Sequence, residues 1–206
     1  MPRLVKQPIS ILSIALIGFI SCSKQDTAGS KHITPEYDTR TGRLQTLKYD
    51  SNGDGKVDMT STMDGSRVLK IEIDQDFDGV PDRWEYYDGS QRLEKVGFSR
   101  ARDGKEDAWS FADASGNIEK IEISTRRDGR IQRVEYYEGG VLARADEDTD
   151  GDGKLDKWET YDGSRLATVA FDTLRRGAAD RRMIYRPDGS ARMEFDPKGD
   201  GAWAPR

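Results

Sequence analysis

The sequence has almost none of the residues on which most hydrolases and zinc enzymes depend. It contains one cysteine and one histidine among 206 residues. The single histidine, His32, lies in the N-terminal segment and excludes Ser-His-Asp and Cys-His triads as well as multi-histidine zinc sites. A phosphate-binding loop of the GxxxxGK[ST] type is also missing. We therefore expect no enzyme, and a hydrolase that uses a pair of carboxylates is the least favoured alternative.

Hydrophobic residues and excess positive charge are also scarce. Hydrophobic residues make up 34% of the chain, below the ~45–50% of typical domains, a range that also counts glycine. A large two-sided core is therefore not expected. The net charge of −5 means that acidic residues outnumber basic ones, whereas a nucleic-acid binder needs an excess of basic residues. The 4 Trp, 8 Tyr and 6 Phe argue against a disordered chain.

The dense hydrophobic run covers residues 9–20 and follows Arg3 and Lys6. It is shorter than the ~20 residues of a membrane-spanning helix. A basic start followed by a short apolar run is typical of a secretory signal peptide, which we place at residues 1–21. An ordinary signal peptide with an incidental cysteine behind it is the simpler alternative.

The sequence Phe19-Ile-Ser-Cys22 resembles the lipobox of bacterial lipoproteins, with Phe19 where that family usually has leucine. The resemblance implies that Cys22 carries lipid chains such as palmitate and becomes the mature N-terminus. Residues 22–36 are then the lipidated cysteine and a flexible tether. The expected location is the bacterial cell envelope, on the outer membrane, the periplasmic face of a membrane or the cell surface.

Beyond the tether, residues 37–206 repeat with a period of about 24 residues. Glycines mark the period at spacings of 24, 25, 25, 24, 24 and 24, and all but Gly177 follow an aspartate. They are Gly55, Gly79, Gly104, Gly129, Gly153, Gly177 and Gly201. Each unit has an aromatic run such as Trp84 to Tyr87, a turn, and an alternating run such as Ile71 and Ile73. Both runs are typical of strands.

The fold expected from this pattern is all-β. Tandem hairpins of about 24 residues would form an extended or curled antiparallel meander of twelve to fourteen strands. A closed barrel and a propeller with two units per blade remain open. The segment Tyr37-Asp-Thr-Arg-Thr-Gly-Arg-Leu44 resembles the YD repeats of bacterial surface and toxin shells. That resemblance implies a hairpin stack without catalysis.

Three of the glycine loops are rich in acids at alternate positions. Counted from the first aspartate, oxygen side chains stand at positions 1, 3, 5 and 9, with glycine at position 6. The three sets are Asp50, Asn52, Asp54 and Asp58; Asp74, Asp76, Asp78 and Asp82; and Asp148, Asp150, Asp152 and Asp156. A simple turn needs one Asp-Gly pair, whereas several carboxylates this close repel each other unless a cation lies between them.

This spacing resembles the calcium loop of EF-hand and related Asp-rich proteins. The resemblance implies Ca²⁺ as cofactor, with the carbonyls of Lys56, Val80 and Lys154 at position 7 and the carboxylates of Glu85 and Glu159 at position 12 as further ligands. The first loop has Ser61 at position 12 and is expected to bind more weakly. Because the next turn follows at once, there is no room for flanking helices, so we expect a structural ion between strands.

Trp84, Trp109 and Trp158 lie five residues after a marker glycine. Residues in equivalent positions of successive units would stack across the sheet. The predicted function is thus an exported, lipid-anchored repeat protein with calcium-stabilised loops and a structural or binding role. The membrane is its expected partner, together with an envelope protein or glycan and no nucleic acid. The alternative is a carbohydrate- or protein-binding module that uses the aromatic strand face.

Overall fold

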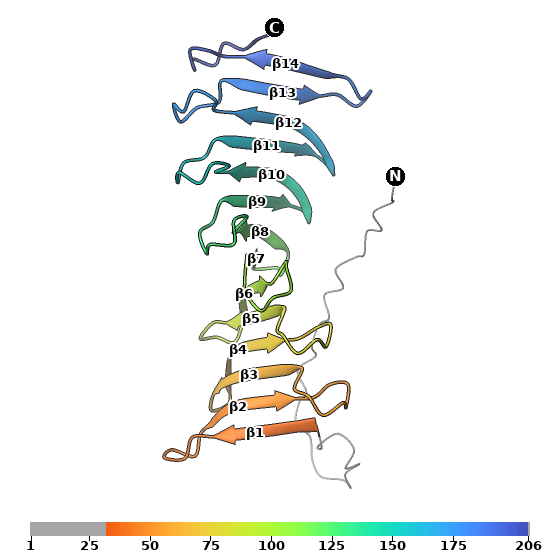
Figure 1. Cartoon of the computed structure of the whole chain (residues 1–206), viewed down its shortest axis with the longest axis vertical. Helices are drawn as coiled ribbons and strands as arrows, with labels where there is room; N and C mark the ends of the chain where they lie inside the picture. The colour runs from red at the N-terminus through yellow and green to blue at the C-terminus, as the bar shows by residue number, and fades with distance from the viewer. Residues whose placement is uncertain (1–31, 206) are drawn as a thin grey trace.

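A computed structural model describes residues 32–205, which form one antiparallel sheet of 15 strands in the order of the sequence (Figure 1). The strands are β1 (Ile33–Tyr37), β2 (Leu44–Tyr49), β3 (Met59–Asp64), β4 (Arg67–Ile73), β5 (Arg83–Tyr87), β6 (Leu93–Phe98), β7 (Ala108–Ala112), β8 (Ile118–Ile123), β9 (Arg133–Glu138), β10 (Val141–Glu147), β11 (Lys157–Asp162), β12 (Arg165–Phe171), β13 (Arg181–Tyr185), β14 (Ala191–Phe195) and β15 (Ala204–Pro205).

The expected meander of hairpins is confirmed. Each strand pairs with the next strand of the chain, and no strand skips a neighbour among residues 32–205. All seven marker glycines have positive φ, between 77° and 95°, which a side chain with Cβ rarely adopts. The sheet already begins at Ile33, within the last residues of the segment expected as a tether. Residues 1–31, which include the predicted signal peptide and Cys22, lie outside the described part.

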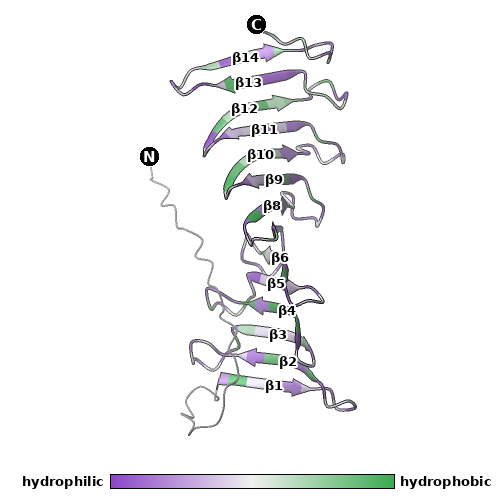
Figure 2. Cartoon of the chain, turned by 180° about the vertical axis from the view of Figure 1, so that it is seen from behind, coloured by the Kyte–Doolittle hydropathy of each residue, from purple (hydrophilic) through white to green (hydrophobic). Residues whose placement is uncertain are grey.

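The sheet is a single layer that stays open and twists along its length. Figure 1 shows β1–β3 and β12–β14 running across the view, whereas β6–β8 are seen nearly end-on, as the twist of a long sheet requires. Hydrophobic and hydrophilic residues are interspersed along the strands (Figure 2). The buried hydrophobic residues of the described chain are few: Ile71, Trp84, Val96, Ala108, Ala145 and Val169. No second layer covers this sheet within the described residues, so each strand is held mainly by its pairing with the strands beside it.

One face, here called the aromatic face, carries the predicted line of tryptophans. Trp84 of β5 is paired with Gly97 of β6, which is paired with Trp109 of β7. Two residues further along the strands, Tyr86 lies between the ammonium groups of Lys70 and Lys95, which are 5.7 and 4.5 Å from its ring centre. Trp84 is only 4% exposed. Its ring therefore packs within the sheet and presents no open face to a ligand.

Gly97 creates room on the aromatic face for a side chain from a loop. The carboxylate of Glu106 lies over Gly97 and accepts hydrogen bonds from the Tyr86 hydroxyl and from Trp109 Nε1, the latter at 2.7 Å. A Cβ on residue 97 would come within 2.1 Å of Glu106 Oε2. The absent side chain thus lets one carboxylate hold aromatic residues of β5 and β7, the two strands on either side of β6.

The opposite face carries a network of ion pairs around Arg133. Its guanidinium contacts Glu135 at 2.9 Å, Glu147 at 3.1 Å and Glu159 at 2.7 Å. Lys157 contacts Glu147 at 3.1 Å and Glu159 at 2.7 Å. The network joins strands β9, β10 and β11. Because these side chains are largely shielded from water, their charges interact more strongly than charges on an open surface.

We expect Gly97→Ala to destabilise the protein by about 1–3 kcal/mol, because Glu106 must move and leave Tyr86 and Trp109 without their acceptor. Chemical denaturation of the purified protein measures the effect. Gly89→Ala is the matched control, since a Cβ there meets nothing within 4 Å. Equal stability of the two variants would contradict the role given to Gly97.

We expect acid to weaken the Arg133 network. Burial alone would raise the pKa of Glu159, but hydrogen bonds from Arg133, Lys157 and Tyr161 outweigh burial and lower the pKa to about 2. A lowered folded-state pKa means that ionised Glu159 stabilises the fold above its unfolded value of about 4.3. That contribution is lost as pH falls from there through the folded value.

The variant Glu159→Gln tests this pH dependence by urea unfolding. It should be less stable than wild type at neutral pH, and the difference should shrink as the pH approaches the folded-state pKa of about 2. Glu119→Gln, a change at an exposed position, should show no such trend. A stability difference for Glu159→Gln that does not vary with pH would contradict the expectation.

Candidate metal loops

Seven loops connect successive hairpins, or the last strands, and lie one after another at the same ends of the paired strands. We call them loop 1 to loop 7, and they cover 50–58, 74–82, 99–107, 124–132, 148–156, 172–180 and 196–204. Each has positive φ at position 6, the marker glycine, and at position 4. Position 4 is glycine in loops 1, 5 and 7, but Phe77, Arg102, Arg127 and Arg175 adopt the same conformation in the others.

Position 1 of each loop caps its own turn. In loop 5, Asp148 Oδ1 accepts the N–H of Gly151 at 2.6 Å and Oδ2 accepts that of Gly153 at 2.8 Å. Asp50, Asp74, Asp172 and Asp196 accept the N–H of their marker glycine in the same way, at 2.5–2.9 Å. In loop 4 the hydroxyl of Ser124 accepts the N–H of Gly129 at 3.2 Å. The first residue of each loop is therefore structural whether or not it also binds a metal.

Positions 1 and 9 also join each loop to the loop before it. The N–H of position 1 donates to the carbonyl of position 9 in the preceding loop, at 2.7–2.9 Å for all six successive pairs, from Asp74 with Asp58 to Asp196 with Asp180. Side chains at these positions are mostly buried, with Ser124 0% and Asp107 2% exposed. We call these residues the loop column. The interpretation of the acids as metal ligands missed this role, although positions 1 and 9 of loops 3, 4 and 6 carry polar residues without the acidic pattern.

Two loops bring three carboxylates together. Ligand oxygens of Asp74, Asp76 and Asp78 in loop 2 lie within 4.8 Å of one another, and so do those of Asp148, Asp150 and Asp156 in loop 5. Each group could hold a metal ion, and hard carboxylate oxygens suit a hard divalent cation. Loop 1 forms no such group of acidic residues, because Asn52 stands at position 3.

The basic residues of neighbouring loops reach back to these acids. Arg102, at position 4 of loop 3, contacts Asp76 of loop 2 at 2.8 Å. Arg175 of loop 6 contacts Asp150 of loop 5 at 2.7 Å. The structure therefore pairs one acid of each cluster with an arginine of the following loop.

The other predicted ligands have partners of their own. Glu85 is bound by Arg83 at 2.9 Å and by the Tyr87 hydroxyl at 2.7 Å, and Glu159 belongs to the Arg133 network. Both stand at the third residue of their strand, so each lies on a sheet face, whereas a helix would turn position 12 back toward the loop. At position 7, the N–H groups of Lys56, Val80 and Lys154 each donate to the carboxylate at position 5, at 2.8 Å. Asp54, Asp78 and Asp152 are thus fixed by the turn.

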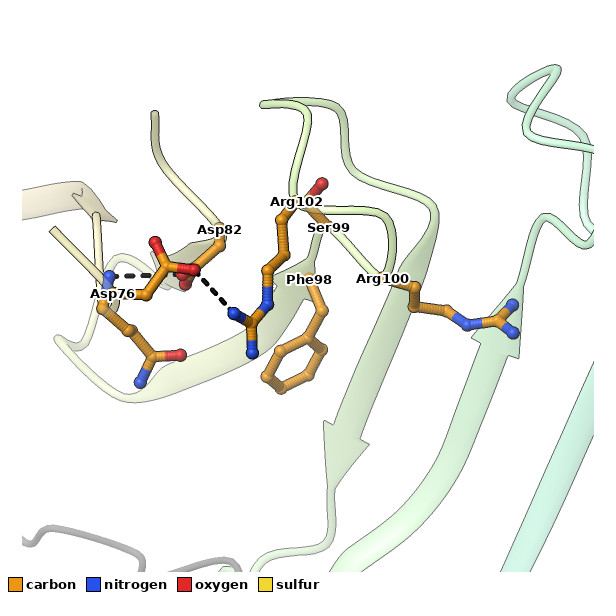
Figure 3. Close-up of a pocket in the computed structure, with 7 residues that line it drawn as sticks. Asp76, Asp82, Phe98, Ser99, Arg100 and Arg102 are labelled. Carbon is orange, nitrogen blue, oxygen red and sulfur yellow. Dashed lines mark hydrogen bonds and ion pairs between the residues drawn. The ribbon is translucent and has the colours of Figure 1, made fainter. Parts of the chain in front are cut away.

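Two hollows lie between consecutive loops. One, of ≈ 510 Å³, is lined by Gln75, Asp76, Asp82, Phe98, Ser99, Arg100 and Arg102 from loops 2 and 3 (Figure 3). The other, between loops 5 and 6, has a volume of only ≈ 40 Å³ and is lined in part by Asp150, Asp156 and Arg175. The two acidic clusters therefore sit beside spaces of very different size.

Comparisons with known proteins do not assign a family. No family model matches the chain, and no curated protein matches it. Among solved structures, the crystal structure of TcdB2-TccC3-TEV is similar with 12% identity and a TM-score of 0.21. The match covers 81% of this chain but 13% of the other. A TM-score this low does not establish a shared fold, so the fold rests on the sheet itself. Within residues 32–205, no helix is long and apolar enough to cross a membrane.

Proposed function

We propose that the protein is an exported, lipid-anchored β-repeat protein whose acidic loops bind calcium, with a structural or binding role at the cell envelope. The observation that carries the metal part is the recurrence of three clustered carboxylates in two loops of the same design. The anchor rests on the sequence that ends at Cys22. Both parts together describe a stack of hairpins held at a membrane surface.

Calcium would act on the loops by neutralising charge. Asp74, Asp76 and Asp78 in loop 2, and Asp148, Asp150 and Asp156 in loop 5, would hold the ion. Carboxylates within 4.8 Å of one another repel each other, and a bound divalent cation replaces that repulsion with attraction. Because both loops belong to the loop column, stabilising them also stabilises the hairpins on either side. Affinities of about 10⁻⁴–10⁻³ M are usual for extracellular calcium modules.

We expect millimolar calcium to raise the melting temperature by a few degrees, since a ligand at ten times its Kd stabilises by about 1.4 kcal/mol per site. The double variant Asp78→Asn, Asp150→Asn should lose most of this shift. Asp200→Asn is the matched control: Asp78 and Asp200 both stand at position 5 and accept the N–H of position 7, at 2.8 and 3.0 Å. A wild-type melting temperature that does not change with calcium would argue against the site, and so would an equal loss of the calcium-induced shift in the double variant and in Asp200→Asn.

The arginines of the following loops provide a second arm of the same experiment. Arg102 and Arg175 hold one carboxylate of each cluster, so they compete with a cation for it. Arg102→Ala and Arg175→Ala should therefore lower the calcium concentration at half saturation in isothermal titration. Arg130, which contacts Asp128 in its own loop at 2.9 Å, is the control position, and Arg130→Ala should leave calcium binding unchanged.

The anchor has its own test. Cys22→Ala should move the protein from the membrane fraction to the soluble fraction of the producing cells, because lipid chains contribute about 0.8 kcal/mol per buried methylene. Metabolic labelling with a palmitate analogue should mark wild type only. Unchanged partitioning of Cys22→Ala together with absent labelling of wild type would reject the lipid anchor while leaving the calcium proposal standing.

A further inference from the structure

The two end strands of the sheet are paired incompletely. Within residues 32–205, β1 pairs only with β2, and β14 pairs with β13 and with the two residues of β15. Every residue of β1 is exposed, and Met193 of β14 is 42% exposed. An edge with unpaired backbone groups can take up a further strand, so the residues along both edges decide which strand fits.

The pairing of β1 with β2 shows which backbone groups of β1 face outward. The N–H of Asp50 donates to the carbonyl of His32 at 3.0 Å, so alternate residues from His32 onward direct their backbone groups toward β2. The backbone groups of Ile33 and Pro35 therefore point away from β2. Because proline has no N–H, the outer edge offers two carbonyls and one N–H at these residues.

β15 does not pair with β14 in the register found at the other loops. At loops 1 to 6, the residue just before the loop pairs with the first residue after it, as Phe171 pairs with Arg181. Around loop 7, Phe195 pairs instead with Ala204, the last residue of the loop. A shift of one residue exchanges the two faces of a strand. β15 is therefore short and out of register, and its pairing with β14 does not extend to Met193.

The outer edge of β1 fits β14 in the regular register. His32 accepts the N–H of Asp50 as Asp58 accepts that of Asp74, so Ile33 corresponds to the first residue after a loop. Four residue pairs join β12 and β13. The same register between β14 and β1 of a second copy would give the pairs Ile33 with Phe195, Thr34 with Glu194, Pro35 with Met193, and Glu36 with Arg192.

The side chains that this register brings together are complementary. Directly opposite residues of an antiparallel pair share a face. On one face, two apolar residues of β1 would meet two apolar residues of β14. On the other face, Glu36 would lie opposite Arg192, and their side chains are 49% and 47% exposed and so within reach of a second copy. Lys48 binds Glu36 at 2.7 Å and Glu194 binds Arg192, so the contact would join two ion pairs into a row of alternating charge.

We propose that copies of this chain associate head to tail, with the outer edge of β1 in one copy paired with β14 of the next. The two residues of β15 would give way to the longer strand. Pro35 leaves the carbonyl of Met193 without a donor, which weakens the contact. Because the two edges are different, each added copy presents a free edge again, so association continues beyond a dimer. The proposal depends neither on calcium nor on the lipid anchor.

The test is sedimentation velocity of the full chain with Cys22→Ala, which removes the only cysteine and any lipid on it. We expect dimers and longer species that grow with protein concentration between about 10 µM and 1 mM, since one pair of strands makes a small and weak interface. Pro35→Thr would supply the missing donor and should lower the concentration at half association about fivefold.

Charge reversal tests the register. Glu36→Arg and Arg192→Glu each place like charges opposite one another and should each raise the concentration at half association about fivefold or more. An equimolar mixture of the two variants restores opposite charges at every contact and should associate as wild type does. Glu119→Arg, a change at an exposed position of the central strand β8, should leave association unchanged. Thermal melting of each variant shows that it folds.

Cysteine pairs identify the edges in contact. Glu36→Cys and Arg192→Cys, made in separate copies that carry Cys22→Ala, should form a mixed disulfide. Opposite residues at a pair without hydrogen bonds have Cα atoms about 4.5 Å apart, within the range that a disulfide spans. Glu119→Cys in place of Glu36→Cys should not form one.

Three results would overturn the proposal. A protein that stays monomeric up to about 1 mM would leave these edges to a strand of another protein. Association that stops at a dimer would indicate a symmetric contact between like edges. A mixture of Glu36→Arg and Arg192→Glu that associates no better than either variant alone would contradict the register.

Discussion

The loop column is the constraint on which the rest of the structure depends. A sheet of one layer has no second layer to hold its strands, and the buried apolar residues of the described chain are few. Backbone hydrogen bonds from position 1 of each loop to position 9 of the loop before close the open end of the hairpin between them and so tie consecutive loops together, while strand pairing joins one hairpin to the next. Most of those positions carry polar side chains, which need hydrogen-bond partners because an unpaired polar group there would be buried. Strand register and loop stacking follow from the same contacts.

The same loops can carry function because the column uses only part of each. Positions 1 and 9 are committed to the fold, whereas positions 3 and 4 vary from loop to loop. An aspartate at position 3 completes the clusters of loops 2 and 5 together with acids at positions that the turn fixes, and arginine at position 4 ties a loop to its predecessor. A cation and an arginine are therefore alternative partners for the same carboxylates. Loop 2 combines such a cluster with a hollow that the other acidic loop nearly lacks.

Much of this arrangement can be predicted from the sequence, because it depends on local spacing. The marker glycines and alternating runs are sufficient to predict the hairpins, their order and the line of Trp84 and Trp109. Contacts that cross from one unit to another were not predictable. The period does not reveal that Arg102 turns back to loop 2, or that Gly97 leaves space for Glu106. Glu85 was predicted as a ligand from the resemblance to the EF-hand loop, which is followed by a helix. Here a strand follows the loop and directs Glu85 to a sheet face. Asp74 was interpreted only as a metal ligand. An aspartate that caps a turn and an aspartate that binds a metal cannot be told apart in the sequence.

Because each hairpin contacts only its neighbours, the open sheet has no closure condition to satisfy. A closed barrel fixes its number of strands, whereas here a unit of about 24 residues could be duplicated or deleted as a whole and the remaining contacts would form as before. Such a change would lengthen or shorten the molecule by two strand spacings, or about 9.5 Å. It would also rotate the far end relative to the near end, since every strand adds to the twist. Gene-level changes in repeat number would thus set both the reach of the protein and the direction in which its last loops face.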